Sequence, residues 1–205
     1  MKTFRQIIQY DKLLGHRYVP NLFTRMRYGN DGYFLETDNH GFRNSPTELS
    51  GEKKIIFLGD SFTAGDGVSN ADRFSDLIRN DLNCEVVNIG VSGYGADQQI
   101  LAYEEISTKI DHDVIVFAPH LDDLKRNLMS SREGINKSSG NGALIPKPYF
   151  ELAKEVLLLK NVPVPLERKN IESNKNENSD FSFYRRAINF VNRKLFNKQL
   201  HPELS

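Results

Sequence analysis

The chain has 205 residues, and its 27 lysines and arginines balance its 27 aspartates and glutamates, so its formal net charge is zero. This length suits one α/β domain, or one domain with an appendage. The zero charge disfavours a nucleic-acid partner, because binding a polyanion requires an excess of basic residues. No apolar run reaches the length of a membrane span. No Cys/His cluster has the spacing of a zinc site, so neither a metal nor a cofactor is expected.

The N-terminal decapeptide is too polar for the apolar core of a signal peptide. The single cysteine, Cys84, cannot form an internal disulfide and is expected to be a small buried apolar residue. These features predict a soluble, cytoplasmic protein.

Residues 1–50 are expected to form an irregular lead-in. Their apolar residues follow no sustained period, and Pro20, Asn21 and the run from Gly29 to Gly32 indicate turns. A short strand is predicted at Tyr33–Thr37. Because the segment lacks a periodic apolar surface, we expect it to wrap around the following domain rather than to fold alone.

Residues 51–128 are expected to form the α/β core. Short apolar runs predict buried strands at 54–58, 85–89 and 113–118. Apolar residues at helical spacing predict helices at 72–82 and 98–110, and a shorter one at 121–129. Strands that alternate with helices indicate βαβ crossovers and a parallel sheet. Three strands make a thin sheet, so we expect it to be incomplete on its C-terminal side.

Residues 129–205 are expected to form a loop-rich insertion followed by an amphipathic helix. The run from Ser130 to Pro148 is rich in Ser, Asn, Gly and Lys and predicts a loop. The polar run 170–180 predicts disorder or a mobile loop. The helix is predicted at 181–200 as a packing helix, or alternatively as one that binds a partner's groove, with an apolar stripe formed by Tyr184, Ile188, Val191 and Leu195.

A polar segment follows each predicted strand. The three segments are Gly59-Asp60-Ser61, Asn88 to Gly95, and His120 to Asp123. The carboxyl ends of parallel strands meet at one edge of a sheet, so we expect these segments to converge there. A serine hydroxyl at this edge can attack a carbonyl carbon. The N–H groups of Ser61 and Gly93 would then stabilise the oxyanion, an interaction worth ~3 kcal/mol per donor.

The segments Gly59-Asp60-Ser61-Phe62-Thr63 and Asn88 to Gly93, with the polar segment after the third strand, resemble the first three sequence blocks of the SGNH/GDSL hydrolases. Asn39 to Arg43 is similar to the approach segment of a subgroup with larger, inserted domains. The resemblance covers about residues 38–128. It implies a three-layer α/β/α, flavodoxin-like fold and cleavage or transfer of acyl esters, with Ser61 as the nucleophile and Gly93 in the oxyanion hole.

The third and last blocks of that family are altered in this chain. Asp122 stands where the family has an oxyanion-binding asparagine, and a carboxylate cannot donate a hydrogen bond unless it is protonated. Asn127, a helical turn further on, is the alternative candidate for the role of that asparagine. The late histidine, His201, stands where the family has its general base. However, Lys198 stands where the family has the aspartate that orients this base. On this interpretation the chain lacks the family's final Asp-x-x-His block.

Simpler interpretations stand beside these. Ser61 could merely cap the helix that follows a strand, and the glycines from 90 to 95 could be turn residues, since their spacing is not that of a dinucleotide-binding loop. His120 is a spare histidine at the same edge, with either a structural role or a role as a substitute base. Asp122 and Asp123 fit a charge pair at a helix N-terminus as well as a metal site.

Two functional hypotheses follow. The first is a serine esterase or acyl hydrolase that acts on a small ester or an O-acyl carbohydrate. The second is a catalytically inactive, truncated or degenerate protein of the same fold that acts by binding. The second hypothesis also predicts an exposed sheet edge beside the third strand, through which the chain could self-associate.

Overall fold

The computed structural model describes residues 2, 4–29, 31–44, 53–135, 142–166 and 169–170. All of these except Asn170 belong to one compact unit, Met1–Lys169. The predicted polar run after Asn170, the amphipathic helix predicted at 181–200, and His201 lie outside the described residues. Within the described ranges, no helix is long and apolar enough to cross a membrane.

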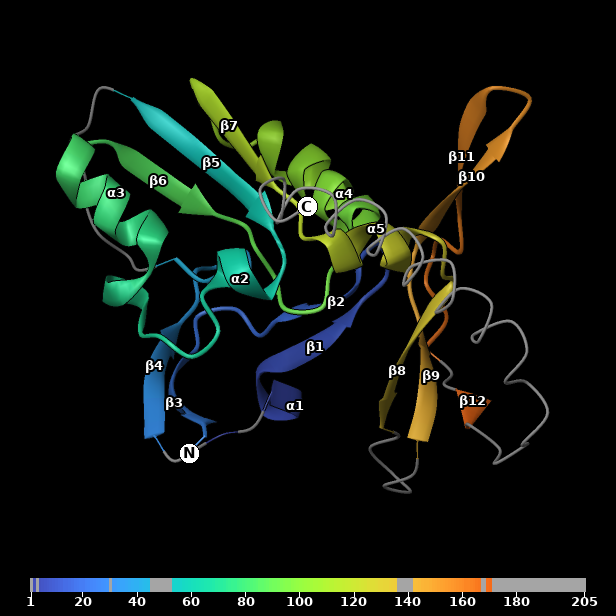
Figure 1. The fold of residues 1–205 in the computed structure, drawn as a ribbon, viewed down its shortest axis with the longest axis horizontal. Helices are drawn as coiled ribbons and strands as arrows, with labels where there is room; N and C mark the ends of the chain where they lie inside the picture. Colours follow the sequence, from blue (N-terminus) through green and yellow to red (C-terminus); the bar gives the residue numbers. More distant parts are fainter. Residues whose placement is uncertain are drawn as a thin grey trace, which may run out of the picture. The chain divides into compact units, whose positions relative to one another are not determined.

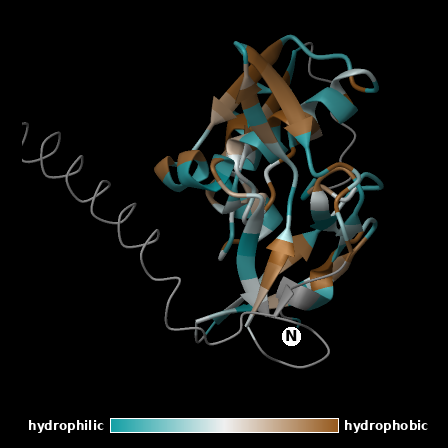
Figure 2. Ribbon diagram, turned by 90° about the vertical axis from the view of Figure 1, so that its right-hand side faces the viewer, coloured by the Kyte–Doolittle hydropathy of each residue, from teal (hydrophilic) through white to brown (hydrophobic). Residues whose placement is uncertain are grey.

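This unit contains a three-stranded parallel sheet (Figure 1). Its central strand is β5 (Lys54–Gly59), which pairs in parallel with β6 (Glu85–Asn88) on one side and with β7 (Val114–Ala118) on the other. The α/β class and the three predicted parallel strands are therefore confirmed. In Figure 2 these strands are largely apolar, as expected for strands that face a core.

The helices alternate with these strands along the chain. They are α2 (Ser61–Ala64), the 3-10 turn η1 (Asn70–Asp72), α3 (Phe74–Leu82), α4 (Ala96–Ser107) and α5 (Leu121–Asn127). Helix α3 packs against β6, whereas α4 packs against β5 and α5. The helices predicted at 72–82, 98–110 and 121–129 are thus present, with ends shifted by at most three residues, as is usual at fraying helix termini.

The N-terminal segment is more regular than the sequence predicted. After α1 (Phe4–Ile7), it forms two antiparallel hairpins, β1 (Ile8–Asp11) with β2 (Gly15–Tyr18), and β3 (Phe23–Tyr28) with β4 (Asp31–Glu36). The prediction of an irregular lead-in is wrong for the first three strands, although the strand predicted at Tyr33–Thr37 is confirmed as β4. These strands are short and bury few side chains each, so their apolar residues show too little periodicity in the sequence.

The N-terminal segment shares its core with the parallel sheet. Leu14, Tyr18 and Leu35 are fully buried in the same apolar cluster as Ile56 of β5 and Ile89. Each fully buried side chain of this size contributes about 1.5–3 kcal/mol relative to an exposed one. The hairpins are therefore part of the fold that holds the sheet.

The loop predicted from Ser130 to Pro148 is also wrong. The chain there forms an antiparallel hairpin, β8 (Ser131–Ile135) with β9 (Gly142–Pro146), and then a second hairpin, β10 (Tyr149–Ala153) with β11 (Val156–Lys160). A last short strand is β12 (Lys169–Asn170). The composition of β8 is polar, so its strand structure depends on backbone pairing with β9 rather than on an apolar pattern that a sequence can show.

One buried ion pair fixes the β8–β9 hairpin to the helices. The side chain of Lys147 is 2% exposed and binds the equally buried carboxylate of Asp97 in the first turn of α4. Its Nζ also donates to the carbonyl oxygens of Met129 (3.2 Å) and Pro148 (2.8 Å). Burial lowers the pKa of Lys147 and raises that of Asp97, while their mutual attraction opposes both shifts. Loss of either partner would leave a buried charge uncompensated.

Strand β7 pairs only with β5 within the described residues, and it forms one edge of the parallel sheet. Its side chains are unusually accessible for a core strand, since Val114, Ile115 and Phe117 are 45%, 44% and 45% exposed. The strand carries no charged residue and no proline, the two devices that commonly protect a sheet edge.

Candidate functional site

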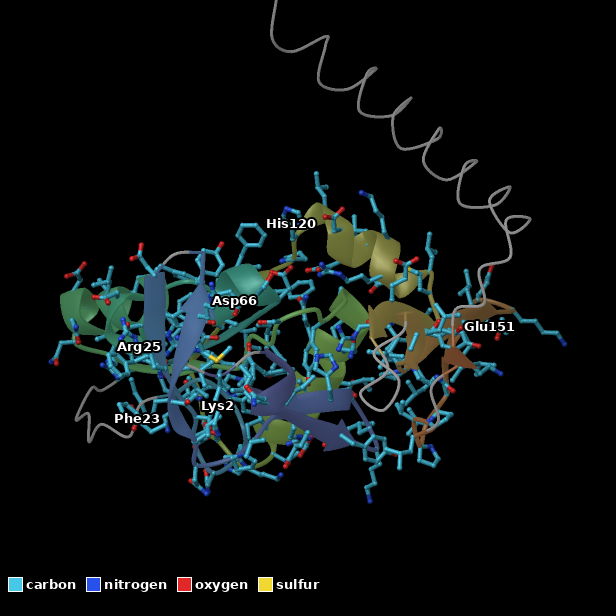
Figure 3. The ribbon with its side chains drawn as sticks, turned by 90° about the horizontal axis from the view of Figure 1, so that it is seen from below. Lys2, Phe23, Arg25, Asp66, His120 and Glu151 are labelled. Atoms are coloured by element: carbon cyan, nitrogen blue, oxygen red, sulfur yellow. The ribbon has the colours of Figure 1, made fainter. Side chains whose placement is uncertain are left out.

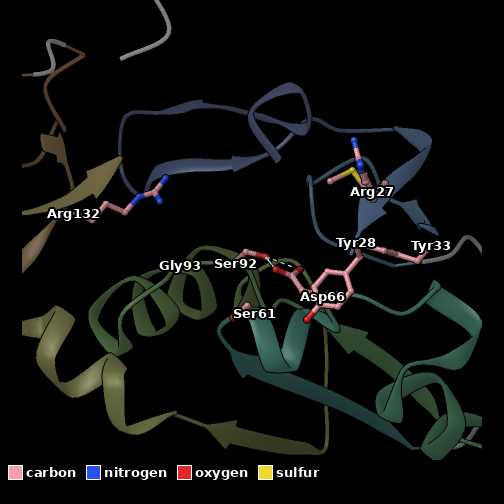
Figure 4. Close-up of a pocket in the computed structure, with 9 residues that line it drawn as sticks. Arg27, Tyr28, Tyr33, Ser61, Asp66, Ser92, Gly93 and Arg132 are labelled. Carbon is pink, nitrogen blue, oxygen red and sulfur yellow. Dashed lines mark hydrogen bonds between the residues drawn. The ribbon is translucent and has the colours of Figure 1, made fainter. Parts of the chain in front are cut away.

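A pocket of about 320 Å³ lies where the loops that follow β5 and β6 meet. Three parts of the chain line it. The β3–β4 hairpin contributes Met26, Arg27, Tyr28 and Tyr33 (Figure 4). The two strand-end loops contribute Ser61, Asp66, Ser92 and Gly93. The β8–β9 hairpin contributes Arg132. The sequence-predicted residues Ser61 and Gly93 therefore lie on the wall of the same pocket.

Ser61 is the first residue of α2, directly after the central strand. The buried carboxylate of Asp60 caps this helix, because its Oδ1 accepts a hydrogen bond from the N–H of Phe62 at 2.9 Å. The Oδ2 of Asp60 binds the guanidinium of Arg126 on α5 at 3.1 Å. The side-chain oxygen of Ser61 has no hydrogen-bond partner among the described residues and remains available at the pocket wall. Asp60 thus performs the capping role that one interpretation gave to Ser61.

The tight turn at Ser61 depends on two strand-end glycines. A Cβ atom on Gly59 would lie 1.8 Å from Oγ1 of Thr63, and one on Gly90 would lie 2.7 Å from the backbone nitrogen of Ala64. Neither distance is possible for real atoms without movement of the helix. Helix α2 therefore rests directly on the ends of two strands, and this contact fixes where Ser61 lies.

Arg43 holds the loop that follows α2. Its fully buried guanidinium donates to the carbonyl oxygens of Ala64 and Gly65, both at 2.7 Å, and of Val68 at 2.8 Å. It also donates to the side-chain oxygen of Asn70 at 2.9 Å. Burial lowers the pKa of Arg43, but a guanidinium keeps its charge at neutral pH. The N-terminal segment thus positions the loop that contributes to the pocket.

Gly93 adopts a left-handed backbone conformation, with φ of +83°, which favours glycine over other residues. Among the described residues, no acceptor binds the backbone N–H of Gly93 or that of Ser61. Two such N–H groups beside a serine hydroxyl are the donors that an oxyanion would need. The geometry therefore places a serine hydroxyl at the pocket wall together with two backbone N–H groups that have no acceptor in the described part of the chain.

A partly buried hydrogen-bond chain forms part of the pocket wall. The hydroxyl of Ser92 donates to the carboxylate of Asp66, with both oxygens at 2.7 Å, and its Oγ lies 2.7 Å from the hydroxyl of Tyr18. Burial raises the pKa of Asp66, which the hydrogen bond from Ser92 and the charge of Arg43 oppose. Burial also raises the pKa of Tyr18. Asp66 is the only described carboxylate that lines the pocket, and sequence reasoning missed it.

The third strand-end loop does not reach the pocket. Asp122 is exposed, and its carboxylate binds Nζ of Lys125 at 2.6 Å. His120 lies at the start of α5 (Figure 3), where its ring stacks on Phe62 with centroids 4.9 Å apart. Its Nδ1 accepts a hydrogen bond from the N–H of Asp122 at 3.2 Å. Neither Asp122 nor His120 is among the residues that line the pocket, whereas Ser61 and Gly93 are.

The other polar residues of this region also have structural contacts. Asp123 is fully buried; its Oδ2 accepts a hydrogen bond from Gln99 at 2.8 Å, and its Oδ1 binds Arg126. The side-chain oxygen of Asn127 accepts a hydrogen bond from the N–H of Asp97 at 3.2 Å. His16 is buried with its Nε2 3.1 Å from the carbonyl oxygen of Ser92, outside the pocket lining.

The described residues contain no group of three or more His, Cys, Asp or Glu side chains that could hold a metal ion. Compared with models of protein families and with curated proteins, the chain has no match. Among the described residues, the site combines a serine hydroxyl, two backbone N–H donors, one carboxylate and two arginine side chains around one pocket.

Proposed function

We propose that this chain is a serine-dependent ester hydrolase of the SGNH/GDSL type, acting on a small ester or an O-acyl carbohydrate. One observation carries the proposal. Ser61 and Gly93 follow neighbouring parallel strands and line one pocket, and their N–H groups have no acceptor among the described residues. In open α/β sheets, the carboxyl ends of the strands are where ligands bind.

The proposed reaction begins with attack of the Ser61 Oγ on the ester carbonyl carbon. A bond forms between that oxygen and the carbon, and the hydroxyl proton leaves for a base as negative charge develops on the carbonyl oxygen. The N–H groups of Ser61 and Gly93 stabilise this charge, at about 3 kcal/mol for each donor. The alcohol then leaves with a proton, and water hydrolyses the acylated serine.

The three-layer α/β/α arrangement of that family is part of the same proposal. The parallel order β6-β5-β7, with α3 packed on β6 and α4 packed on β5, supports it. The antiparallel hairpins at both ends of the described chain are additions to that arrangement.

The test is hydrolysis of 4-nitrophenyl acetate, together with labelling by a fluorophosphonate and identification of the labelled residue by mass spectrometry. We expect an adduct on Ser61 and a loss of at least about 10³-fold in kcat/KM for Ser61→Ala. Ser107→Ala, which removes an exposed hydroxyl on α4, is the matched control and should keep full activity. Absence of turnover and of an adduct in the wild-type protein would refute the proposal.

A second candidate function is binding without catalysis. The observation that favours it is that no histidine lines the described pocket, where a serine hydrolase would need a general base. On this proposal the pocket holds an ester or a carbohydrate without cleaving it. Ser61→Ala would then leave ligand affinity unchanged, whereas a parallel loss of hydrolysis in that variant would exclude this candidate.

Self-association through β7 is a proposal about partners. The unprotected strand edge and the exposed side chains of Val114, Ile115 and Phe117 support it. We expect light scattering to show dimers or larger species, which Phe117→Lys should convert to monomers by placing a charge on the edge. Phe23→Lys, on the exposed side of the β3–β4 hairpin, is the control. A wild-type protein that is monomeric at all concentrations tested would contradict the proposal.

A further inference from the structure

We propose that Arg132 makes the Ser61 pocket selective for ligands that carry a carboxylate, so that the substrate is an ester with a carboxylate on its acyl half or on its alcohol half. This inference rests on the proposed function and specifies its substrate class. Arg132 belongs to β8, far from the strand-end loops in the sequence, and no sequence motif singled it out.

The position of the guanidinium carries the inference. Nη1 of Arg132 lies 3.4 Å from the point that a Cβ atom of Gly93 would occupy, so the cation stands beside the proposed oxyanion donor. In Figure 4 the side chain extends from β8 toward Gly93. A ligand whose carbonyl group binds at Gly93 would therefore have its neighbouring atoms within reach of Arg132.

The hairpin that carries Arg132 is fixed rather than loosely attached. Arg132 pairs with Ile145 across the hairpin, and the N–H of Lys147 donates to the carbonyl oxygen of Ser130 at 3.0 Å. Lys147 in turn forms the buried ion pair with Asp97. A cation on such a support loses little freedom when it binds a ligand, and this favours affinity.

The charges of the pocket favour an anionic ligand. Its described ionisable residues include two arginines and a single aspartate. The carboxylate of Asp66 accepts a hydrogen bond from the hydroxyl of Ser92, and burial raises the pKa of Asp66. Arg27 adds positive charge at the rim, although its guanidinium points away from Ser61 in Figure 4.

A carboxylate is the group that best fits a single guanidinium, because its two oxygens match the two parallel N–H groups of arginine. Tyr28 and Tyr33 also line the pocket, and a tyrosine hydroxyl can donate a hydrogen bond to a ligand. The pocket volume of about 320 Å³ is at the lower end of the range for small-ligand sites, so it accommodates a ligand of the size of a monosaccharide.

The test measures binding, not turnover, with two pairs of ligands that contain no ester. The first pair represents the alcohol half of the ester: methyl β-glucuronide carries a carboxylate and methyl β-glucoside does not. The second pair represents the acyl half: succinamate carries a carboxylate and butyramide does not. We expect the carboxylate-bearing member of one pair to bind wild-type protein about 10- to 100-fold more tightly in calorimetric titrations. The pair that shows the preference identifies the half of the ester that carries the charge.

Variants assign the preference to Arg132. Arg132→Gln should abolish it, Arg132→Lys should retain part of it, and Arg25→Gln, at an exposed arginine outside the pocket, should leave it unchanged. Equal affinity for charged and neutral ligands in the wild-type protein, or an unchanged preference in Arg132→Gln, would overturn the inference. Ester hydrolysis without any charge preference would refute this inference alone. If the protein shows a charge preference that depends on Arg132 but hydrolyses no ester, the proposed hydrolase function is refuted and the carboxylate-binding pocket is supported.

Discussion

The loops that leave the carboxyl ends of β5 and β7 differ in what holds them. The loop after β5 is fixed by other parts of the chain, since Arg43 binds three of its carbonyl oxygens and Arg126 binds its Asp60. The loop after β7 is held largely by its own helix, where the N–H of Asp122 binds His120 and the Asp122 carboxylate binds Lys125. Its contacts with other parts of the chain include the stacking of His120 on Phe62 and the hydrogen bond from Gln99 to Asp123. The first loop reaches the pocket, whereas the third does not.

The difference shows that a position at a strand end does not by itself make a site. Each loop has polar side chains that could serve in a catalytic site, but these side chains make different hydrogen bonds in the two loops. In the third loop they cap α5 and pair with each other, which satisfies the helix N-terminus locally. In the first loop the capping is done by Asp60, so Ser61 is left at the pocket wall.

The largest expected effect comes from removing the clamp on the first loop. Arg43→Met deletes the charged donor for the carbonyl oxygens of Ala64, Gly65 and Val68 and leaves them buried, which should lower the free energy of unfolding by about 3–5 kcal/mol. Urea denaturation measures the loss. The matched change in the third loop is Lys125→Met, which breaks an exposed ion pair and should cost at most about 1 kcal/mol after solvent screening. Similar losses in the two variants would remove the distinction between the loops.

A smaller effect is expected at Gly93. Gly93→Ala places a side chain in the left-handed region and about 3.4 Å from Arg132, so we expect a loss of stability of about 1–2 kcal/mol and a lower rate of ester hydrolysis. Gly29→Ala is the control, because Gly29 has a φ of +55° but nothing within 4 Å of a new Cβ atom. It should cost similar stability and leave hydrolysis unchanged. Equal activity in the two variants would count against a role of Gly93 in the site.

Asp66 should make stability depend on pH. Burial raises the pKa of Asp66 above its ordinary value of 3.8, so the folded state binds this proton more tightly than the unfolded state does. The resulting stabilisation is complete below pH 3.8 and is lost as the pH rises through the raised pKa. Asp66→Asn stays neutral and can still accept the hydrogen bond from Ser92. Its Tm relative to the wild-type protein should therefore increase from pH 3.5 upward and level off once Asp66 is ionised.

Thermal melts between pH 3.5 and 8 measure this difference. Asp31→Asn, at an exposed position of β4, provides the control and should show no such pH trend relative to the wild-type protein. The difference in Tm between Asp66→Asn and the wild-type protein could instead stay constant or decrease with rising pH. Either result would show that burial of the charge is not the dominant effect at Asp66.

The smallest effect is expected in the third loop. Asp122→Asn restores the residue type that the SGNH resemblance implies at this position, but Asp122 is exposed and outside the pocket. We therefore expect unchanged stability within about 0.5 kcal/mol and ester hydrolysis within about twofold of the wild type. A gain or a loss of tenfold in kcat/KM would mean that the third loop does contribute to the site.

The parallel sheet could be predicted because each of its strands is a short apolar run between turn signals, and because helical spacing separates the runs. The β8–β9 hairpin could not, since residues such as Ser131 and Glu133 carry no apolar pattern and the hairpin depends on pairing and on the buried Lys147. Sequence reasoning placed Ser61 and Gly93 at the same sheet edge. It missed Asp66 and Arg132, because their places at the pocket follow from tertiary contacts rather than from local spacing.

The contact between Thr63 and the two strand-end glycines has a consequence for how this site can change. Because the space above Gly59 and Gly90 is filled by α2, no single substitution at either glycine can be accommodated while Thr63 stays in place. In a mutational library, a side chain at Gly59 should therefore survive only with a smaller residue at Thr63, whereas Gly90, which also meets the backbone nitrogen of Ala64, should accept no side chain. Transplanting the Ser61 turn to another sheet would require carrying all three positions together.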